Sequence, residues 1–350
     1  MKNKRLLRVG SIAVLALWLV VLGLIGVYSE EAMASNPGST KTFDLKYAGV
    51  LPKGNALAVV PEWWSKEVEK RTGGKVKVTL YHAQALGKGM DYPEMLKGGA
   101  MDLASLTNYH PSFPMLQVFD LPFVAPNRAV AMDTFYMLYY KGLLEQELQD
   151  YKVLWWQPVD PIFVCLRNKK VVNAEQFKGL KVRGQPGPKT EFVKELGATG
   201  ISMPTPEVYM ALDRGIIDGL TTTPEFFSQG KLYEVAKYWI WEPLCTGGNV
   251  VAMNLKLWKS LPTDIKLIVE QLSAEARYRM VDMAFKTPEE SRKELQELGA
   301  EVYSLSEEER ARWHEAGQRV VDEWLRKNEG KGLPASQVLE ESKWVAKSYQ

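Results

Sequence analysis

The sequence predicts an α/β protein of two domains, because short strand patterns alternate with helical patterns along most of its length. Residues 75–81 (KVKVTLY) alternate as a half-buried strand does, whereas residues 55–71 have helical periodicity and end at Thr72-Gly73-Gly74. About 316 residues follow residue 34, and a stretch of that length exceeds one ordinary hydrophobic core. We therefore expect two α/β domains.

The other elements are predicted from the same two patterns and from the glycine and proline residues that end them. Further strands are expected, in chain order, at residues 43–49, 101–106, 152–156, 162–167, 180–183, 243–245 and 250–254. Further helices are expected at residues 90–97, 128–150, 191–196, 206–212, 263–298 and 306–328. No repeat or low-complexity segment interrupts this order.

The N-terminus has the parts of a secretory signal peptide. Basic residues within the first eight positions precede an uncharged apolar run at residues 12–27, and Ala32-Met33-Ala34 matches a small-x-small cleavage site. An uncleaved membrane anchor is the alternative, but this apolar run is short for a membrane span. We expect residues 1–34 to be a signal peptide that is cleaved near Ala34.

Charge excludes a polyanionic partner. The chain carries 44 Lys and Arg residues against 42 Asp and Glu residues, and removal of residues 1–34 leaves 40 of each. A neutral exported protein has no basic patch for nucleic acid or anionic lipid, so we expect neither as a partner.

Cysteine and histidine usage argues against a metal site. Cys165 and Cys245 lie in apolar runs, where they could form one disulfide in an oxidising compartment or remain buried thiols. His82, His110 and His314 are far apart in sequence, and no metal-ligand spacing surrounds either cysteine. We expect no metal and no cofactor.

Residues 179–187 (GLKVRGQPG) bring an arginine to the end of a strand. The alternating residues 180–182 lead to Arg183, and Gly184, Pro186 and Gly187 hold the next residues in a stiff turn. A strand end that reaches solvent accepts an arginine at little cost, and a strand end can equally aim the guanidinium into a cleft. This stretch by itself leaves both readings open.

An ordered set of motifs resembles the DctP-type solute-binding proteins of TRAP (tripartite ATP-independent periplasmic) transporters. In the first half these motifs are GGKVKV at residues 73–78, LG at 86–87, LKGGAMD at 96–102 and FDLPF at 119–123. In the second half they are KGLKVR at residues 178–183, EVYMAL at 207–212 and GIIDG at 215–219. Together they cover nearly all of the chain that follows the signal peptide.

The resemblance implies an α/β, two-lobe periplasmic binding protein that closes on a small molecule as a clam does. It implies lobe one at residues 41–159 and lobe two at residues 160–250, joined by crossing strands and each completed by part of residues 251–350. Long helices at residues 263–328 would brace both lobes. The implied protein is a periplasmic monomer that delivers its ligand to TRAP membrane permease subunits and catalyses no reaction.

The resemblance also implies that Arg183 holds the carboxylate of an organic acid. Many family members that bind sugar acids or dicarboxylates carry a second arginine twenty residues earlier, where this chain has Phe163. Arg167 lies on the same face of that strand, where it could substitute or could point to solvent. Thr222 and Thr223 stand where those members have an asparagine. These departures predict a monocarboxylate.

Four aromatic residues near these positions suggest a ligand with an apolar or aromatic body, although aromatic side chains at strand and helix spacing usually form core. They are Trp155, Trp156, Phe226 and Phe227. Among them we expect Trp156 to contact the ligand. In the first lobe, Tyr109 follows a strand end, and Asn55 opens a helix that it can cap. We expect both to line the cleft.

Two other classes of protein remain open from the sequence. An exported α/β hydrolase or transferase could use Asp102, Asp120 or Asp218, but no nucleophile elbow, phosphate loop or paired His-acid motif accompanies them. The second class is a binding protein that presents its ligand to a sensor. Both are alternatives to a transport receptor.

Overall fold

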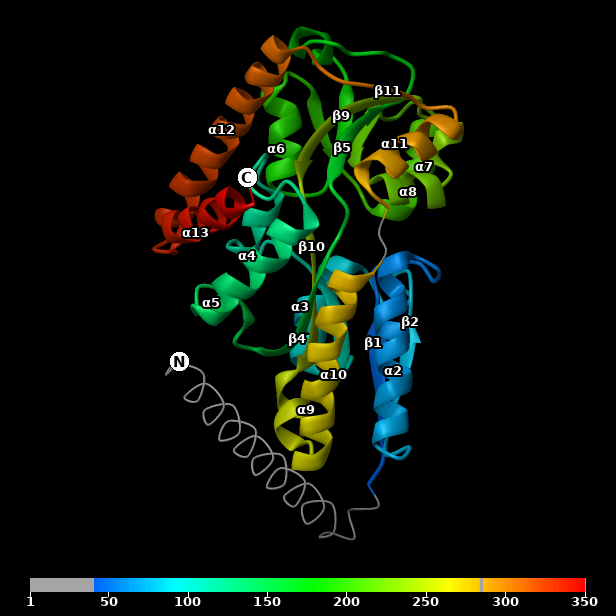
Figure 1. Ribbon diagram of the computed structural model, residues 1–350, viewed down its shortest axis with the longest axis vertical. Coiled ribbons are helices and arrows are strands. Elements are labelled where there is room, and N and C mark those ends of the chain that lie inside the picture. Colours follow the sequence, from blue (N-terminus) through cyan, green and yellow to red (C-terminus); the bar gives the residue numbers. More distant parts are fainter. Residues whose placement is uncertain (1–40, 284–285, 350) are drawn as a thin grey trace, which may run out of the picture. The chain divides into compact units, whose positions relative to one another are not determined.

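The structure is a computed structural model that describes residues 41–283 and 286–349, and residues from Phe43 onward form one compact unit. The predicted signal peptide, residues 1–34, lies outside the described residues. The unit is built on two mixed sheets with helices packed against them (Figure 1). It is therefore an α/β protein, as the alternating patterns predict.

The first sheet has the strand order β2-β1-β3-β10-β4. Its strands are β1 (Phe43–Ala48), β2 (Val76–Tyr81), β3 (Leu103–Thr107), β4 (Tyr151–Pro158) and β10 (Gly248–Asn254). Strand β1 pairs in parallel with β2 and β3, whereas β10 runs antiparallel between β3 and β4. Its helices are η1 (Ala56–Ala58), α2 (Val59–Arg71), η2 (Gly89–Asp91), α3 (Tyr92–Gly98), η3 (Leu116–Asp120), α4 (Arg128–Tyr140) and α5 (Glu145–Leu148).

The second sheet has the strand order β11-β9-β5-β8-β6-β7. Its strands are β5 (Ile162–Leu166), β6 (Lys181–Gly184), β7 (Thr199–Ser202), β8 (Gly219–Thr222), β9 (Tyr238–Cys245) and β11 (Glu301–Tyr303). Strand β6 is parallel to both of its neighbours, β7 and β8. The helices between β5 and β9 are η4 (Ala174–Phe177), α6 (Pro188–Glu195), η5 (Thr205–Glu207), α7 (Val208–Asp213), α8 (Pro224–Gln229) and η6 (Leu232–Glu234).

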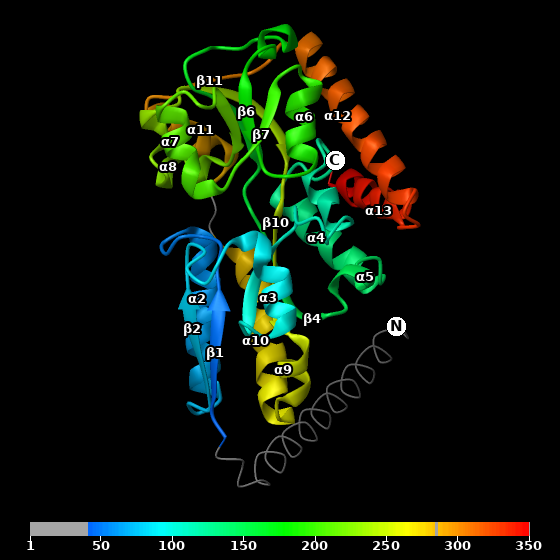
Figure 2. The ribbon, with the colours of Figure 1, turned by 180° about the vertical axis from the view of Figure 1, so that it is seen from behind.

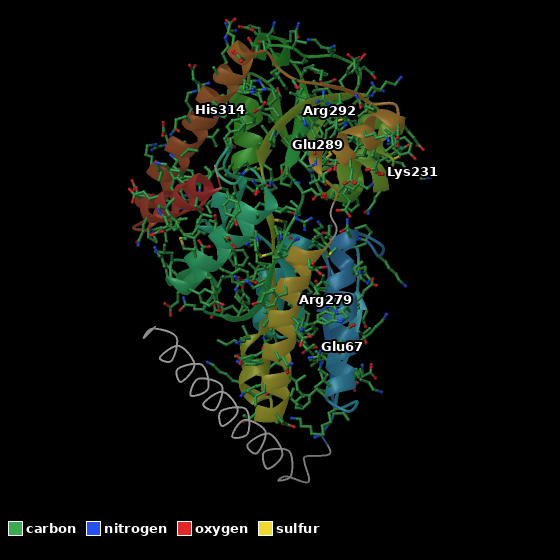
Figure 3. All side chains as sticks on the ribbon, in the orientation of Figure 1. Glu67, Lys231, Arg279, Glu289, Arg292 and His314 are labelled. Atoms are coloured by element: carbon green, nitrogen blue, oxygen red, sulfur yellow. The ribbon has the colours of Figure 1, made fainter. Side chains whose placement is uncertain are left out.

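The C-terminal helices contact elements from both halves of the sequence (Figures 1 and 2). They are α9 (Leu255–Ser260), α10 (Thr263–Asp282), α11 (Pro288–Glu297), α12 (Glu307–Glu329) and α13 (Ala335–Ser348). Helix α10 packs on α2, and Figure 3 labels Arg279 and Glu67 on these two helices. Helix α12 packs on α6 and α13 packs on α4. His314 of α12, labelled in Figure 3, stacks on Phe123 with ring centroids 3.9 Å apart.

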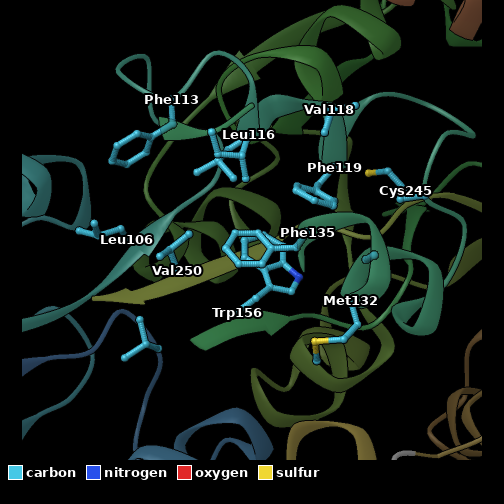
Figure 4. Packing of buried hydrophobic residues seen from close by; sticks show 14 of the residues in the cluster. Leu106, Phe113, Leu116, Val118, Phe119, Met132, Phe135, Trp156, Cys245 and Val250 are labelled. Atoms are coloured by element: carbon cyan, nitrogen blue, oxygen red, sulfur yellow. The ribbon is translucent and has the colours of Figure 1, made fainter. Parts of the chain in front are cut away.

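Aromatic side chains fill the core beneath the first sheet (Figure 4). The ring of Trp156 on β4 stacks on Phe135 of α4 at 4.8 Å between centroids and 8° between planes. Phe119 of η3 lies 4.8 Å from the same indole. Ring contacts of this kind stabilise the fold beyond what the burial of apolar area contributes, and they hold η3 and α4 against the sheet.

Several boundaries differ from the predictions because caps interrupt long helical patterns. The expected helix at residues 263–298 is two helices, since Thr287 begins α11 with a capping box that includes Glu290. The helix expected at residues 128–150 ends at Tyr140, and the next turn contains Gly142 at a φ of 75°. The sequence analysis did not predict β7, β8, β11, α8, α9 or α13.

Candidate functional site

A cavity of about 300 Å³ lies among loops and strand ends that belong to both sheets. Its wall is mostly apolar, with a smaller number of polar groups, as ligand sites usually are. The polar side chains that line it come from Gln84, Lys88, Thr107, Asn108, Tyr109, Arg183, Gln185, Lys189, Ser202, Thr205, Thr222, Thr223 and Asn249. Among the described residues no aspartate or glutamate lines this cavity.

Local sequence explains how Arg183 reaches the cavity. Strand β6 ends one residue later at Gly184, where a Cβ atom would lie 2.7 Å from Thr190 Oγ1 and 2.9 Å from its backbone nitrogen. Glycine is therefore required for the turn to approach α6 so closely. Gly187 has a φ of 94°, and Pro188 begins α6 directly after it. The stiff turn predicted at residues 184–187 thus follows the strand that delivers the arginine.

Arg183 is buried in the cavity wall with only 3% of its surface exposed. Its Nε donates to the carbonyl oxygen of Met203 at 3.3 Å, and its Nη2 donates to that oxygen at 3.1 Å and to Thr205 Oγ1 at 3.3 Å. Within residues 41–283 and 286–349 it forms no ion pair with a carboxylate and no hydrogen bond through Nη1.

The electrostatic state of Arg183 follows from this burial. Loss of solvent lowers the pKa of its guanidinium to about 10, which still leaves it charged at neutral pH. A buried cation without a counter-ion is unfavourable, and an anion that enters the cavity relieves that penalty. A planar carboxylate matches the free face of the guanidinium with parallel hydrogen bonds.

Tyr109 lies near two cations of the cavity. The Nζ of Lys189 is 5.4 Å from its ring centroid. Burial raises the pKa of the Tyr109 hydroxyl, while the charges of Arg183 and Lys189 oppose that rise. The hydroxyl is thus a neutral hydrogen-bonding group beside two positive side chains. This places Tyr109 in the cavity lining, where the sequence analysis expected it.

Thr222 and Thr223 also line the cavity, at the end of β8 and the start of α8. The Thr223 hydroxyl accepts a hydrogen bond from the backbone nitrogen of Phe226 at 3.2 Å and so caps α8. Thr222 Oγ1 has only a 3.5 Å contact with the carbonyl oxygen of Thr223. Of the two hydroxyls, that of Thr222 is the freer to meet a ligand.

Four residues proposed from sequence lie outside the cavity lining. Trp156 is fully buried against Phe119 and Phe135, and Phe163 stacks on Trp241 at 4.5 Å, because both fill core beneath a sheet. Arg167 Nη2 donates to the carbonyl oxygen of Asp213 at 2.9 Å at the exposed end of β5, away from the cavity wall.

Asn55 is the fourth of these residues. Its Oδ1 accepts from Leu57 N at 3.0 Å, so it caps η1 as expected. Its Nδ2 donates to Gln229 Oε1 at 3.0 Å, so the amide nitrogen is already engaged and is not directed at a ligand. Asn55 therefore joins η1 to α8 instead of lining the cavity.

The sequence analysis missed Lys189, Gln185 and the segment Ser202–Thr205, which all line the cavity. Lys189 has the sequence context of an exposed lysine in the first turn of a helix. Its only local cue is the Gly187-Pro188 pair that places it directly after the strand and turn of Arg183. Residues 202–205 meet Arg183 through tertiary contacts, for which no local pattern exists.

In residues 41–283 and 286–349, no group of three or more His, Cys, Asp or Glu side chains could hold a metal ion. In the same part of the chain, no helix is long and apolar enough to cross a membrane. Cys165 and Cys245 are both buried free thiols, so the disulfide alternative is not formed in this structure.

Comparison with known proteins identifies the family of this chain. Residues 50–328 match the model of the DctP family, bacterial extracellular solute-binding protein family 7. The C4-dicarboxylate-binding periplasmic protein DctP of Rhodobacter capsulatus is 29% identical over 319 residues, or 87% of this chain and 93% of that protein. A solute-binding protein of Albidiferax ferrireducens is 26% identical over 333 residues, or 86% of this chain and 94% of that protein.

Solved structures resemble the whole unit. A TRAP solute-binding protein from a marine metagenome, specific for aromatic acid ligands and solved with metahydroxyphenylacetate, has a TM-score of 0.80 and 27% identity. The similarity covers 88% of this chain and 99% of that one. A Bordetella pertussis receptor that binds pyroglutamic acid has a TM-score of 0.79 at 19% identity, over 86% and 100% of the two chains, and supports the fold alone.

These matches define a two-lobe extracytoplasmic solute-binding protein. The chain belongs to the DctP family of TRAP solute-binding proteins, since the family model spans most of its length. The resemblance stated from its motifs is therefore confirmed.

Proposed function

We propose that this protein captures an organic monocarboxylate through Arg183 and delivers it to the membrane permease of a TRAP transporter. The observation that carries the proposal is the buried guanidinium of Arg183, which lines an otherwise largely apolar cavity and forms no ion pair with a carboxylate of the described residues. An anionic ligand would supply the missing partner, and the apolar wall would hold its body.

Relatives differ in ligand, and the cavity favours one kind. One relative carries a C4-dicarboxylate-binding name, whereas two marine metagenome structures hold metahydroxyphenylacetate and 3-hydroxybenzoate. A dicarboxylate would need a second cation that is free of a carboxylate partner, but Arg167 is not in the cavity and Lys189 is paired with Asp120. We infer an aromatic or other apolar monocarboxylate for this chain.

A thermal-shift screen tests this inference, because a ligand that binds only the folded state raises the melting temperature. Benzoate and 3-hydroxybenzoate should raise it more than succinate at equal concentration. Larger shifts with succinate would overturn the monocarboxylate assignment. Shifts with none of the acids would argue against carboxylate binding altogether.

Receptor action without catalysis is part of the same proposal. The exported hydrolase is the competing function, and the cavity wall offers no carboxylate among the described residues to act as acid or base. Incubation of the protein with a bound acid should return that acid unchanged by mass spectrometry. A new product would favour the hydrolase.

Export to the periplasm is the remaining part of the proposed function. Cleavage near Ala34 would release residues 35–350 to the periplasm, where lobes at residues 41–159 and 160–250 would close on the ligand as a monomer. N-terminal sequencing of the exported protein should begin near Ser35. An intact Met1 on that protein would contradict cleavage.

A further inference from the structure

A buried ion pair forms part of the cavity wall. Lys189 lines the cavity, and only 2% of this residue is exposed. It donates a hydrogen bond to Oδ1 of Asp120, a residue with no exposed surface at the end of η3. Asp120 itself does not line the cavity, so a ligand would meet the lysine and not the carboxylate.

The position of Lys189 makes Asp120 its principal stabilising partner. Lys189 is the second residue of α6, at the helix end where the backbone dipole is positive. A cation there is disfavoured by the helix and by burial, so it needs a nearby anion. Asp120 supplies that anion, and its Oδ2 has no hydrogen-bond partner among the described residues.

The pair is packed too closely for another group to enter between its members. A Cβ atom at Gly247, which also lines the cavity, would lie 2.7 Å from Asp120 Oδ1 and 3.6 Å from Lys189 Nζ. The glycine therefore allows the backbone to lie directly beside the pair, while Lys189 still lines the cavity. A ligand carboxylate that approached Lys189 would also approach the negative charge of Asp120.

The cationic side chains that line the cavity differ in how their charges are balanced. Lys88 is exposed and screened by solvent, Lys189 is neutralised by Asp120, and Arg183 has no anionic partner within the described chain. We propose that Asp120 determines ligand charge: it masks Lys189, so the cavity accepts one carboxylate at Arg183 and refuses a second. This proposal rests on the proposed role of Arg183.

Asp120→Asn tests the mask directly, because it keeps the shape of the side chain and removes its charge. Titration calorimetry would compare 3-hydroxybenzoate with isophthalate, which replaces the hydroxyl by a second carboxylate, and with succinate. The variant should improve the affinity for at least one dicarboxylate relative to the monocarboxylate by about tenfold or more. An unchanged ratio for both dicarboxylates would overturn the proposal.

Two control variants separate the mask from a general change in charge. Asp213→Asn changes the net charge equally at an exposed position of α7 and should leave the ratio at its native value. The double variant Asp120→Asn with Lys189→Met removes both charges and should lose the gain in dicarboxylate affinity. Retention of that gain in the double variant would show that Lys189 is not the second site.

A measurement on the native protein covers the case in which Asp120→Asn does not fold. A cavity that accepts one negative charge should bind a dicarboxylate only after it takes up a proton. Calorimetry in buffers of different ionisation enthalpy should therefore show proton uptake with succinate and none with 3-hydroxybenzoate, or no succinate binding at all. Tight succinate binding without proton uptake would overturn the proposal.

The same data distinguish this proposal from the proposed function. If the native protein binds no carboxylate of either kind, the role of Arg183 fails. If it binds the monocarboxylate and only the dicarboxylate results disagree, the masking role of Asp120 fails alone.

Discussion

Arg183 and Lys189 line the same cavity, but their charges are handled differently. Lys189 is paired with Asp120, whereas Arg183 donates to neutral oxygens of Met203 and Thr205. Neutral acceptors hold the guanidinium in place without cancelling its charge, so the positive potential remains available to a ligand. Under the proposed function, this single side chain would both orient and attract the carboxylate of the ligand.

Replacement of Arg183 by alanine should abolish most ligand binding and leave the fold intact. The ligand carboxylate would be buried without its partner, so we expect a loss of about 3–5 kcal/mol, or at least a hundredfold in affinity. Lysine should restore only part of it, because an ammonium lacks the planar fork. Calorimetry gives the affinities, and circular dichroism of the ligand-free variants checks the fold. Native affinity in the alanine variant would contradict the assignment.

Glu147 should make stability depend on pH. Burial raises the pKa of this carboxyl to about 8, although it accepts hydrogen bonds from the backbone nitrogens of Met115 and Leu116. The native state therefore holds a proton that the unfolded chain has released once the pH exceeds about 4.5. The contribution of Glu147 to the free energy of unfolding is fully present below that pH, and it is lost as the pH rises through about 8.

Urea unfolding between pH 5 and pH 9, compared with Glu147→Gln, measures this effect. The native protein should lose free energy of unfolding relative to the variant by up to about 1.4 kcal/mol per pH unit within that window. The prediction concerns the slope of the free energy of unfolding against pH, so a constant difference between the native protein and Glu147→Gln does not affect it. Glu145→Gln on the same helix is exposed and should follow the native slope. Parallel curves for the native protein and Glu147→Gln would contradict the prediction.

At the scale of elements, α13 shows how much of the fold depends on packing. It follows residue 328, where the family match ends, and the sequence analysis did not predict it. Its apolar residues Val338, Leu339 and Val345 are buried where it packs on α4 and α12. The helix therefore covers apolar surface that α4 would otherwise expose.

Leu339→Ala should lower the free energy of unfolding by about 2–4 kcal/mol, since it removes a buried side chain and leaves a cavity. Glu340→Ala on the exposed face of the same helix should change it by less than about 0.5 kcal/mol. Urea denaturation of both variants makes the comparison. Equal effects would show that α13 is not docked in solution as described.

At the scale of the whole molecule, hydrogen bonds join segments that are far apart in the sequence. Ala56 N donates to Glu225 Oε1 at 2.9 Å, and Asn55 Nδ2 donates to Gln229 Oε1. These bonds connect η1 and its N-cap with helix α8, which belongs with the second sheet. Both bonds are only part-buried, so solvent can replace them when the two sheets move apart.

Ligand binding should therefore contract the molecule by hinge closure. Small-angle scattering should show a smaller radius of gyration when a saturating monocarboxylate is added to the native protein. The Arg183→Ala variant at the same ligand concentration should not contract, which separates closure from a general effect of the acid. An unchanged radius for the saturated native protein would argue against closure.

Much of the fold was predictable because it depends on local pattern. Alternating residues gave β2 within one residue of its expected start, and glycine and proline placed the turn between β6 and α6. That turn requires Gly184 for steric reasons, so the position of Arg183 at a strand end was also visible in the sequence. Caps within long helical patterns were harder to place, as the separation of α10 from α11 shows.

The sequence by itself determined the alternation of strands and helices, the arginine at the end of β6 and the family. Only the tertiary structure decided which side chains line the cavity. Trp156 and Phe163 pack into core, Arg167 bonds to a backbone carbonyl, and Lys189 lies on the cavity wall beside Asp120. Local periodicity shows which face of an element is buried, but not what that face is buried against. That partner comes from chain segments as distant as residues 120 and 189, so no short pattern encodes it.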